Sequence, residues 1–495
     1  MQISSLSQST AMKNSIANIQ SQLADLQRQL TSGQKADSFS TLGSATSLVL
    51  SLNNQVSQSN SYINTIDTTQ LRIQTSANAL SSINTMVSKM QTGGLTSTFD
   101  LSNGTGTQTS FQTTAGAYLD QIVSLLNESV ADRNLFGGKD TQTTPVVSTD
   151  MMLNGDTAHV GLKTVIDQRN QADLGADGMG RLSTSTPASD TVALTEDAGV
   201  FGFKLSNVSS NLTGATVTGP TGSPASLSVQ FGSTLPSDGD TISIDMNLPD
   251  GTKTTVKLAA TTKSPAGAGQ FTIGADAATT AANFQSALSS SIKTEAGSTL
   301  KAASTVQAGN DFFGNPPQRV SGTNPYAATS LQNGTTADTV FWYQGDTSGT
   351  AGDNFIATIG DGQQVAYGAR ADQSAIMTAV KNAALLTATQ YDSTDTNAAA
   401  SYAALTQRTS TALNYQNTQS LQGIVTKLGL QSANLDAAKT NLQTQISTSQ
   451  GLLGDNLQSD DYDVSTKITT LMTQLQASYQ VTSSLSKLSL VSYMP

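Results

Sequence analysis

Apolar residues recur at heptad-like spacing near both ends of the chain. They are separated by alternating steps of four and three residues at the start, and a similar stripe returns close to the end. Such spacing places the apolar side chains along one face of a helix, as in a coiled coil. We therefore expect a seam of Met12, Ile16, Ile19, Leu23, Leu26 and Leu30 on a first helix, and of Val464, Ile468, Leu471, Leu475, Leu485 and Leu488 on a last helix.

Further helical patterns follow the first seam. The segment TSGQKADS (31–38) interrupts the first helix, and a second apolar face runs from Ala45 to Met90. The sequence Thr-Gly-Gly at 92–94 is predicted to end this second helix, because glycine commonly terminates helices. Apolar spacing within 117–130 predicts a third helix.

Helical spacing also precedes the last seam. It returns near Ala375 and forms a long amphipathic stretch from Tyr402 to Leu457. The segment DNLQSDDYDVS (455–465) then interrupts it. Aspartates suit the start of a helix, where the macrodipole is positive, so we interpret Asp460 and Asp461 as a helix-start cluster rather than an acid–base pair.

The middle of the chain has a different pattern, rich in Gly, Thr, Ser, Pro and Asp from 140 to roughly 360. DTISIDMNL (240–248) and TKTTVKLAA (252–260) alternate apolar and polar residues around a Pro-Asp-Gly turn, which predicts a β-hairpin. Further elements are predicted as a helix over 282–292 and strands over 338–346 and 352–368.

This order predicts a mainly α fold with an inserted, β-rich (α+β) outer domain. Antiparallel pairing of the N- and C-terminal segments would bury both seams in a long helical coiled-coil core and place the insertion at its far tip. The expected domains are terminal helices (1–40 with 458–495), a helical rod (41–146 with 375–457) and a variable insertion (147–374).

Composition narrows the classes of partner. The 495-residue chain has 12% charged residues and a net charge of −11, which argues against a nucleic-acid or anionic-membrane partner. It has no cysteine, so disulfides and thiolate chemistry are excluded. The start has neither a basic region nor an apolar core of a signal peptide, and no apolar stretch reaches the length of a membrane span. We expect a protein that is cytoplasmic or exported without a cleaved signal.

The sequence offers little for catalysis. His159 is the single histidine, so an HExxH zinc site is impossible, and we expect no catalytic, metal-binding or cofactor-binding residue. GADGMGR (175–181) lacks the lysine of a phosphate-binding loop and is interpreted as a surface turn. Trp342, with Phe341 and Tyr343, is predicted to form the core of the outer domain.

Both ends of the chain resemble the bacterial flagellin family, which includes the filament flagellins and the hook–filament junction proteins. The likeness is carried by the opening MQISSLSQSTAMKNSIANIQSQLADLQRQLTSGQKADS, by ADRNLFGGKDTQTTPV (131–146) and by the segment from LQSANLDAAKTN to the end. It covers about 1–146 and 400–495, in the order that the family has. RNLFGG favours the junction branch, whereas the long insertion favours a filament subunit.

The resemblance implies a non-enzymatic structural subunit that is exported, secreted and polymerised through its terminal helices into the flagellar filament for motility. The alternative is a hook-associated junction protein, and a remote alternative is an enzyme-bearing or adhesin insertion. The implied partners are further copies of the chain, hook-junction and filament-cap proteins, an export chaperone that binds the C-terminal helix, and the flagellar type III export apparatus. Neither nucleic acid nor membrane insertion is expected.

Energetics agree with this role. Ordering a residue costs about 1–2 kcal/mol, and a fully buried Leu or Ile returns about 1.5–3 kcal/mol. The few apolar residues of each terminal helix, half exposed in a lone molecule, do not offset the ordering of the whole helix. We therefore expect the ends to fluctuate in the monomer and to become ordered against neighbouring copies.

One segment bears on host recognition. In many flagellins an arginine-bearing stretch of the second helix contacts the innate receptor that senses flagellin. The stretch similar to it here is LSSINTMVSKM (80–90), in which Ser82 and Asn84 stand in place of the arginines and Thr85 in place of a glutamate. Because arginine is a multidentate anchor at interfaces, these replacements predict weak or absent activation.

Overall fold

The computed structural model describes residues 2–36, 42–104, 106–350, 355–416 and 418–491. Contacts divide the chain into two compact units. We call them the terminal unit (Met1–Thr69, Ala357–Val365 and Ala433–Pro495) and the central unit (Gln70–Ile356 and Ala366–Ser432). Each unit therefore combines segments that are far apart in the sequence.

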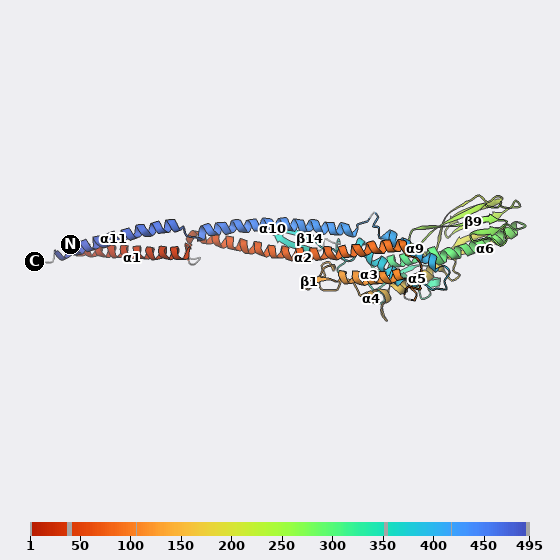
Figure 1. The fold of residues 1–495 in the computed structure, drawn as a ribbon, viewed down its shortest axis with the longest axis horizontal. Coiled ribbons are helices and arrows are strands. Elements are labelled where there is room, and N and C mark those ends of the chain that lie inside the picture. Colours follow the sequence, from red (N-terminus) through yellow and green to blue (C-terminus); the bar gives the residue numbers. More distant parts are fainter. Residues whose placement is uncertain (1, 37–41, 105, 351–354, 417, 492–495) are drawn as a thin grey trace. The chain divides into compact units, whose positions relative to one another are not determined.

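The terminal unit is built mainly from helices, with parts of a short two-stranded sheet. Helices α1 (Gln2–Ser32) and α11 (Asp461–Val491) lie side by side and antiparallel (Figure 1). Two further helices, α2 (Thr46–Thr96) and α10 (Leu421–Leu457), contribute to both units. The pairing confirms the predicted mainly α fold, in which N- and C-terminal segments form an antiparallel helical core.

Local sequence explains where α11 begins. The Asp460 carboxylate accepts hydrogen bonds from the backbone N–H of Tyr462 (3.0 Å) and of Asp463 (3.2 Å). The N–H groups in the first turn of a helix have no acceptor within the helix, so the Asp460 side chain supplies one. Asp461 and Asp463 lie in that first turn, at the positive end of the helix dipole. The predicted helix-start cluster is confirmed.

The central unit contains a second set of helices. Helix α3 begins with a capping box, in which Thr109 and Gln112 each accept a backbone N–H of the other residue. Helix α3 packs on α8, while α7 packs on α5 and α9. The helices are α3 (Ser110–Leu126), α4 (Thr149–Asn154), α5 (Leu162–Leu174), α6 (Ala277–Glu295), α7 (Lys301–Phe312), α8 (Ser374–Ala388) and α9 (Ala398–Ala412).

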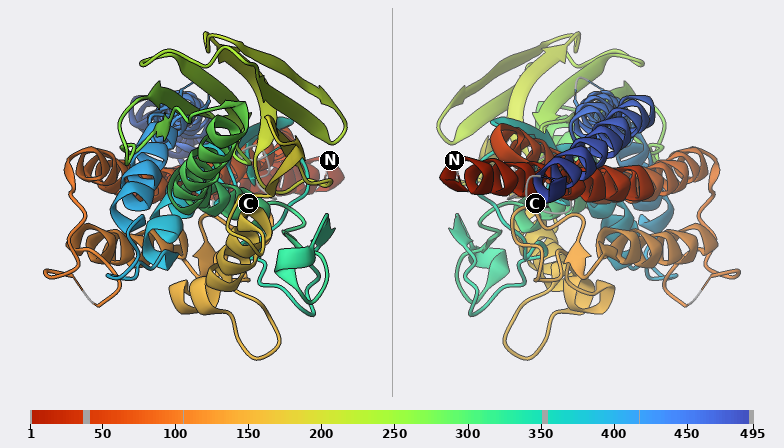
Figure 2. Two further views of the ribbon diagram at one scale, coloured as in Figure 1. Left: turned by 90° about the vertical axis from the view of Figure 1, so that its right-hand side faces the viewer. Right: turned by 90° about the vertical axis from the view of Figure 1, so that its left-hand side faces the viewer.

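Two four-stranded sheets and α6 surround a large buried apolar cluster. The yellow-green strands form a curved layer against the green helix α6 (Figure 2). One sheet has the order β3-β4-β7-β6 and the other β10-β9-β8-β5, in which only the β10–β9 pair is parallel. The strands are β3 (Leu182–Ala188), β4 (Thr191–Glu196), β5 (Lys204–Ser210), β6 (Ala215–Gly222), β7 (Ala225–Phe231), β8 (Thr241–Asn247), β9 (Lys253–Thr261) and β10 (Gln270–Thr272).

Strands β8 and β9 are the predicted hairpin. Ile242, Ile244 and Met246 of β8 are buried and alternate with half-buried residues, as the period of two requires. The turn places Gly251 at a φ of +82°, a conformation that glycine adopts readily. The predicted helix over 282–292 is also confirmed, as part of α6.

Short elements complete the two units and their connections. Helices α6 and α7 are joined by the π-helical segment η3 (Ala296–Leu300). Short 3-10 turns are η2 (Gly43–Ala45) and η4 (Pro325–Ala327). The remaining strands are β1 (Ser129–Val130), β2 (Arg133–Asn134), β11 (Gln318–Val320), β12 (Leu331–Asn333), β13 (Phe355–Gly360) and β14 (Gln363–Tyr367).

Two expected helix boundaries are wrong. Helix α2 does not end at the Thr-Gly-Gly segment but continues through it to Thr96. Glycine allows close packing at both positions, because a Cβ at Gly93 would lie 2.5 Å from the Phe111 ring and a Cβ at Gly94 would collide with Ser410. The expected helical stretch from Tyr402 to Leu457 is interrupted between α9 and α10.

The expected strand over 338–346 is also wrong. That segment makes only isolated bridges, from Thr339 to Val160 and from Tyr343 to Val146. Its apolar side chains serve a different purpose, because Trp342 is 4% exposed and packs on Phe313 with ring centroids 5.2 Å apart. Trp342 is therefore a core residue, as its aromatic neighbours predicted. Strands β13 and β14 agree with the expectation for 352–368 as far as that segment is described.

Candidate assembly interface

The N-terminal seam is only partly covered by its partner helix. Met12, Ile16, Ile19, Leu23 and Leu26 are half-buried. Leu30 is 40% exposed. The heptad face therefore points toward α11 without forming a closed core.

The seam of α11 has the same character. Val464 is buried, with 4% exposure, and Ile468, Leu471 and Leu475 are half-buried. Leu485 is 42% exposed, and the side chain of Leu488 lies outside the described residues. Among the seam side chains that the structure describes, only Val464 reaches full burial.

A groove runs beside the seam between α1 and α11. It has a volume of about 370 Å³ and exposes both apolar and polar side chains. Leu26 and Leu471 contribute its apolar surface, and Asp25 and Lys467 lie among its polar residues. The complete lining is Gln22, Asp25, Leu26, Thr466, Lys467, Thr470 and Leu471. The pair thus leaves space that another side chain can enter.

Apolar side chains of α11 also lie outside the seam. Tyr462 is 84% exposed, and Met472 and Val481 are each 47% exposed. Tyr479 is 49% exposed, although its hydroxyl accepts a hydrogen bond of 2.9 Å from the Gln20 amide of α1. The helix is therefore apolar on more faces than the contact with α1 uses.

The interruptions that end α1 and precede α11 are joined to each other. The Lys35 N–H donates to the Leu457 carbonyl (2.8 Å), and the Ser459 N–H donates to the Gly33 carbonyl (2.9 Å). The Lys35 ammonium also donates to the Asp455 carbonyl at 2.5 Å. Sequence reasoning located both interruptions but gave no sign that they bind each other. We call these contacts the joint.

The remaining predicted residues lie elsewhere, on the central-unit part of α2. Ser82 and Thr85 are exposed, and Asn84 is half-buried. Ser82, Thr85 and Lys89 line a groove of about 510 Å³ with Gln121 and Ser124 of α3. Met86 and Leu125 also line it, so this open surface is mixed in polarity.

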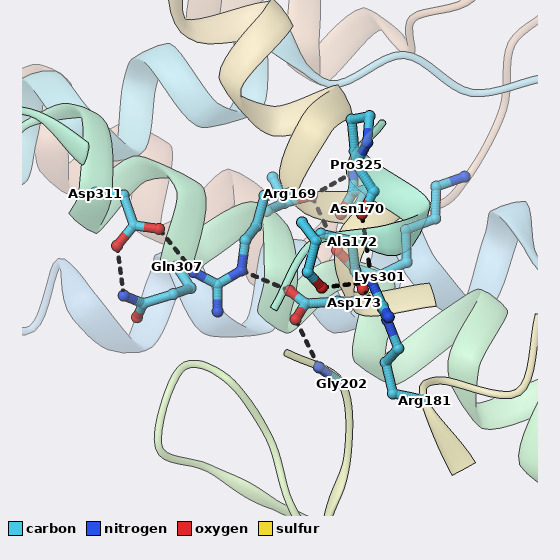
Figure 3. A network of polar contacts seen from close by, with 12 residues as sticks. Arg169, Asn170, Ala172, Asp173, Arg181, Gly202, Lys301, Gln307, Asp311 and Pro325 are labelled. Carbon is cyan, nitrogen blue, oxygen red and sulfur yellow. Dashed lines mark hydrogen bonds and ion pairs between the residues drawn. The ribbon is translucent and has the colours of Figure 1, made fainter. Parts of the chain in front are cut away.

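Three buried charged side chains form a separate network in the central unit. Arg169 of α5 donates to Asp173 and to Asp311 of α7, each at 2.7 Å (Figure 3). The other Asp173 oxygen accepts the backbone N–H of Gly202 at 2.7 Å. The Arg169 guanidinium also lies 5.0 Å from the centre of the Phe201 ring. Sequence reasoning missed this network.

The charged and polar groups of this network satisfy one another's hydrogen bonds, which indicates a structural role rather than a reactive site. Burial raises the pKa of Asp311, while the Arg169 charge opposes that rise. Gln307 donates to the remaining Asp311 oxygen at 2.8 Å. The charges of α5 and α7 therefore fix the relative position of these two helices.

The described ranges contain no cluster of three or more His, Asp or Glu side chains that could hold a metal ion. GADGMGR forms a compact turn with Gly175, Gly178, Gly180 and Arg181 at positive φ. The Arg181 side chain donates to the Ala172 carbonyl at 2.6 Å, so the turn is fastened to α5. Among the described helices, none is both long and apolar enough to cross a bilayer.

Comparison with known proteins identifies the N-terminal part of the chain. No individual curated protein matches the chain. Residues 3–141 match the family model described as the bacterial flagellin N-terminal helical region. These residues include α1, α2, α3 and the RNLFGG segment, which carried the resemblance at the start of the chain. This match, over the N-terminal part of the chain, supports membership of the bacterial flagellin family, a family of structural proteins of the flagellum.

Proposed function

We propose that this protein is the filament subunit of a bacterial flagellum, secreted from the cell and polymerised through α1 and α11 for motility. The observation that carries the proposal is the incomplete burial of the seam after the two helices have paired. Family membership supports a structural role in a polymer. We assign it no enzymatic activity.

The free energy available from assembly is considerable. Full burial of a Leu or Ile side chain yields about 1.5–3 kcal/mol, so a half-buried one has roughly 1 kcal/mol still to gain. Summed over the half-buried seam and the exposed Met472, Tyr479 and Val481, the gain is on the order of 10 kcal/mol per subunit. Such a gain supports docking of neighbouring copies on both helices.

The proposed arrangement follows from this role. The terminal helices (1–40 with 458–495) line the inside of the polymer, the helical segments 41–146 and 375–457 surround them, and 147–374 lies on the outside. Before assembly an apolar α11 needs cover, which supports an export chaperone that binds the C-terminal helix. The type III export apparatus, the filament cap and the hook-junction proteins are the further partners we propose.

The test is a pair of matched substitutions, Leu475→Asp and Val200→Asp. Leu475 belongs to the seam, whereas Val200 is 55% exposed in the insertion. Losing the burial of one Leu and adding a charge costs about 2–3 kcal/mol per contact, which raises the critical concentration for polymerisation roughly 30- to 150-fold. Sedimentation of polymer should show this rise for Leu475→Asp only. Equal polymerisation of both variants would contradict the proposal.

A hook–filament junction protein is the second candidate, and the RNLFGG segment favours it. Leu135 and Phe136 of this segment are buried, with 4% and 0% exposure. The insertion of some two hundred residues favours the filament subunit instead. The number of copies in isolated flagella distinguishes the two, because a filament subunit recurs along the whole filament and a junction protein forms a short ring.

A further inference from the structure

The single histidine of the chain lies in a tight loop between α4 and α5. Gly155 and Val160 form an antiparallel bridge that closes this loop. Within it, the Asp156 carboxylate accepts the backbone N–H of Ala158 (2.8 Å) and of His159 (2.7 Å). The loop therefore fixes a carboxylate directly beside the imidazole.

Both ring nitrogens of His159 face acceptors. Nδ1 lies 2.8 and 2.9 Å from the two Asp156 carboxylate oxygens, and Nε2 lies 3.1 Å from the Thr336 carbonyl oxygen. A carboxylate and a carbonyl only accept hydrogen bonds. A neutral imidazole carries one N–H, so it can satisfy one of the two contacts, whereas the imidazolium satisfies both. The geometry therefore selects the protonated ring.

The second contact joins two segments that are distant in the sequence. Thr336 belongs to the segment 335–340, which leads into the buried Trp342. The same two segments exchange backbone hydrogen bonds, from Val160 N–H to the Asp338 carbonyl (2.9 Å) and from Val340 N–H to the Val160 carbonyl (3.1 Å). His159 thus lies at one end of a short parallel contact.

The charges around the ring are mostly negative. Asp156 is the nearest, and Asp338 follows on the facing segment. Arg319 lies on β11, with its guanidinium 3.8 Å from the Asp338 carboxylate, and offsets part of that second charge. The hydrogen bond to Asp156 is the main cause that raises the pKa of His159, and the same bond lowers the pKa of Asp156 to about 2.

We propose that His159 is a pH-sensitive clasp, which ties the loop 155–160 to the segment 335–340 while it is protonated and loosens that tie when it loses its proton. Its contribution is complete below the ordinary histidine pKa of about 6.5 and is lost as the pH rises through the higher pKa of the folded state. The contact is therefore tightest in acid.

The experiment uses the full chain as a monomer, with ¹³C-labelled histidine and NMR titration from pH 5.5 to 8.5. Because there is one histidine, its Cε1–H signal needs no assignment. We expect a midpoint above 6.5 in the wild type and a lower midpoint in Asp156→Asn, which keeps an acceptor for the backbone N–H groups but removes the charge. A wild-type midpoint at or below 6.5 would overturn the proposal.

Hydrogen exchange then tests the clasp itself. Peptides that contain Val160 and Val340 should lose protection, corrected for intrinsic exchange, as the wild-type histidine deprotonates. In His159→Gln, which retains a donor but does not titrate, protection should not change across that pH range. Protection that is constant in the wild type, or that falls equally in His159→Gln, would show that the two segments do not respond to this histidine.

Discussion

The α1–α11 pair and the β-rich core of the central unit represent opposite ways to use apolar residues. The pair has long seams, yet only Val464 among its described seam side chains is buried. In the β-rich core, Phe231, Phe271 and Phe284 are fully buried and pack edge to face, with ring centroids 5.3, 5.6 and 6.2 Å apart. The β-rich core buries these aromatic side chains within a single chain, whereas the α1–α11 pair leaves most of its described seam side chains partly exposed.

Composition explains the difference. Neither α1 nor α11 contains Phe or Trp, whereas the β-rich core is centred on phenylalanine. Each buried aromatic removes 150–250 Å² from water. Narrow Leu and Ile seams remove less and favour contact with further helices. We therefore expect the stability of the α1–α11 pair to depend on protein concentration and that of the β-rich core not to.

Deleting 464–495 should have the largest effect, a complete loss of polymerisation. The deletion removes most of α11 and with it the cover of α1, but none of the β-rich core. Electron microscopy should show no filaments, and circular dichroism should show that the unfolding of the β-rich core is unchanged. Filaments of normal appearance would contradict the expected role of α11 in polymerisation.

Replacing Arg169 should strongly destabilise the central unit. Arg169→Met leaves the buried Asp173 and Asp311 carboxylates without their cation, which costs about 3–5 kcal/mol in unfolding free energy. Denaturant unfolding measures this cost. The triple variant Arg169→Met, Asp173→Leu and Asp311→Leu should recover much of it, because no unpaired charge remains. An unchanged midpoint for Arg169→Met would contradict the buried network.

A matched pair of truncations compares the two regions directly. Phe284→Ala should lower the unfolding free energy of the β-rich core by about 3–4 kcal/mol, because it opens a cavity among Phe231 and Phe271. Leu471→Ala should cost the monomer only about 1 kcal/mol, since that side chain is half-buried, but should weaken the polymer. Equal costs in the monomer would show that the seam is already closed.

Removing the β-rich sheets should affect assembly little. Exchanging 183–294 for a Gly/Ser linker deletes β3 to β10 and most of α6, but it keeps α7, which packs on α5, α8 and α9. Exchanging 190–360 removes α7 as well and should destabilise the helices that it covers. Electron microscopy should show filaments for the first variant. Loss of filaments in the first variant would make the sheets part of the assembling region.

The smallest effect is expected on receptor activation. We predict a weak response of reporter cells to the wild-type monomer, because Ser82, Asn84 and Thr85 replace charged anchors. The exposed positions of Ser82 and Thr85 make the surface accessible to such a test. The triple variant Ser82→Arg, Asn84→Arg and Thr85→Glu should raise the response. A strong wild-type response, or no gain in the variant, would place recognition at other residues.

Sequence reasoning succeeded where a period is long or a turn is specific. The seams predicted α1 and α11, and alternation around Pro-Asp-Gly predicted β8 and β9, because these patterns depend on neighbouring residues alone. It failed at Gly93 and Gly94, which normally suggest a helix end, because Phe111 and Ser410 decide what fits there.

Sequence reasoning also failed where the buried side chains are polar or small. Helix α7 has the sequence KAASTVQAGNDF, in which alanine, serine and threonine are buried and no heptad is visible. The Arg169 and Asp173 pair has the four-residue spacing of a helical ion pair, which is a usable signal, but its burial depends on Asp311, 142 residues away. Such contacts are properties of the tertiary structure.

The hydrogen bonds of the joint determine how much its sequence can vary. Its two principal bonds link main-chain atoms, from Lys35 to Leu457 and from Ser459 to Gly33, so most side chains can be exchanged without breaking them. Two restrictions remain. Proline at 35 or 459 would remove a donor. Gly33 has a φ of +68°, a conformation that residues other than glycine adopt poorly. Related chains can therefore keep this connection while sharing almost no residue identities around it.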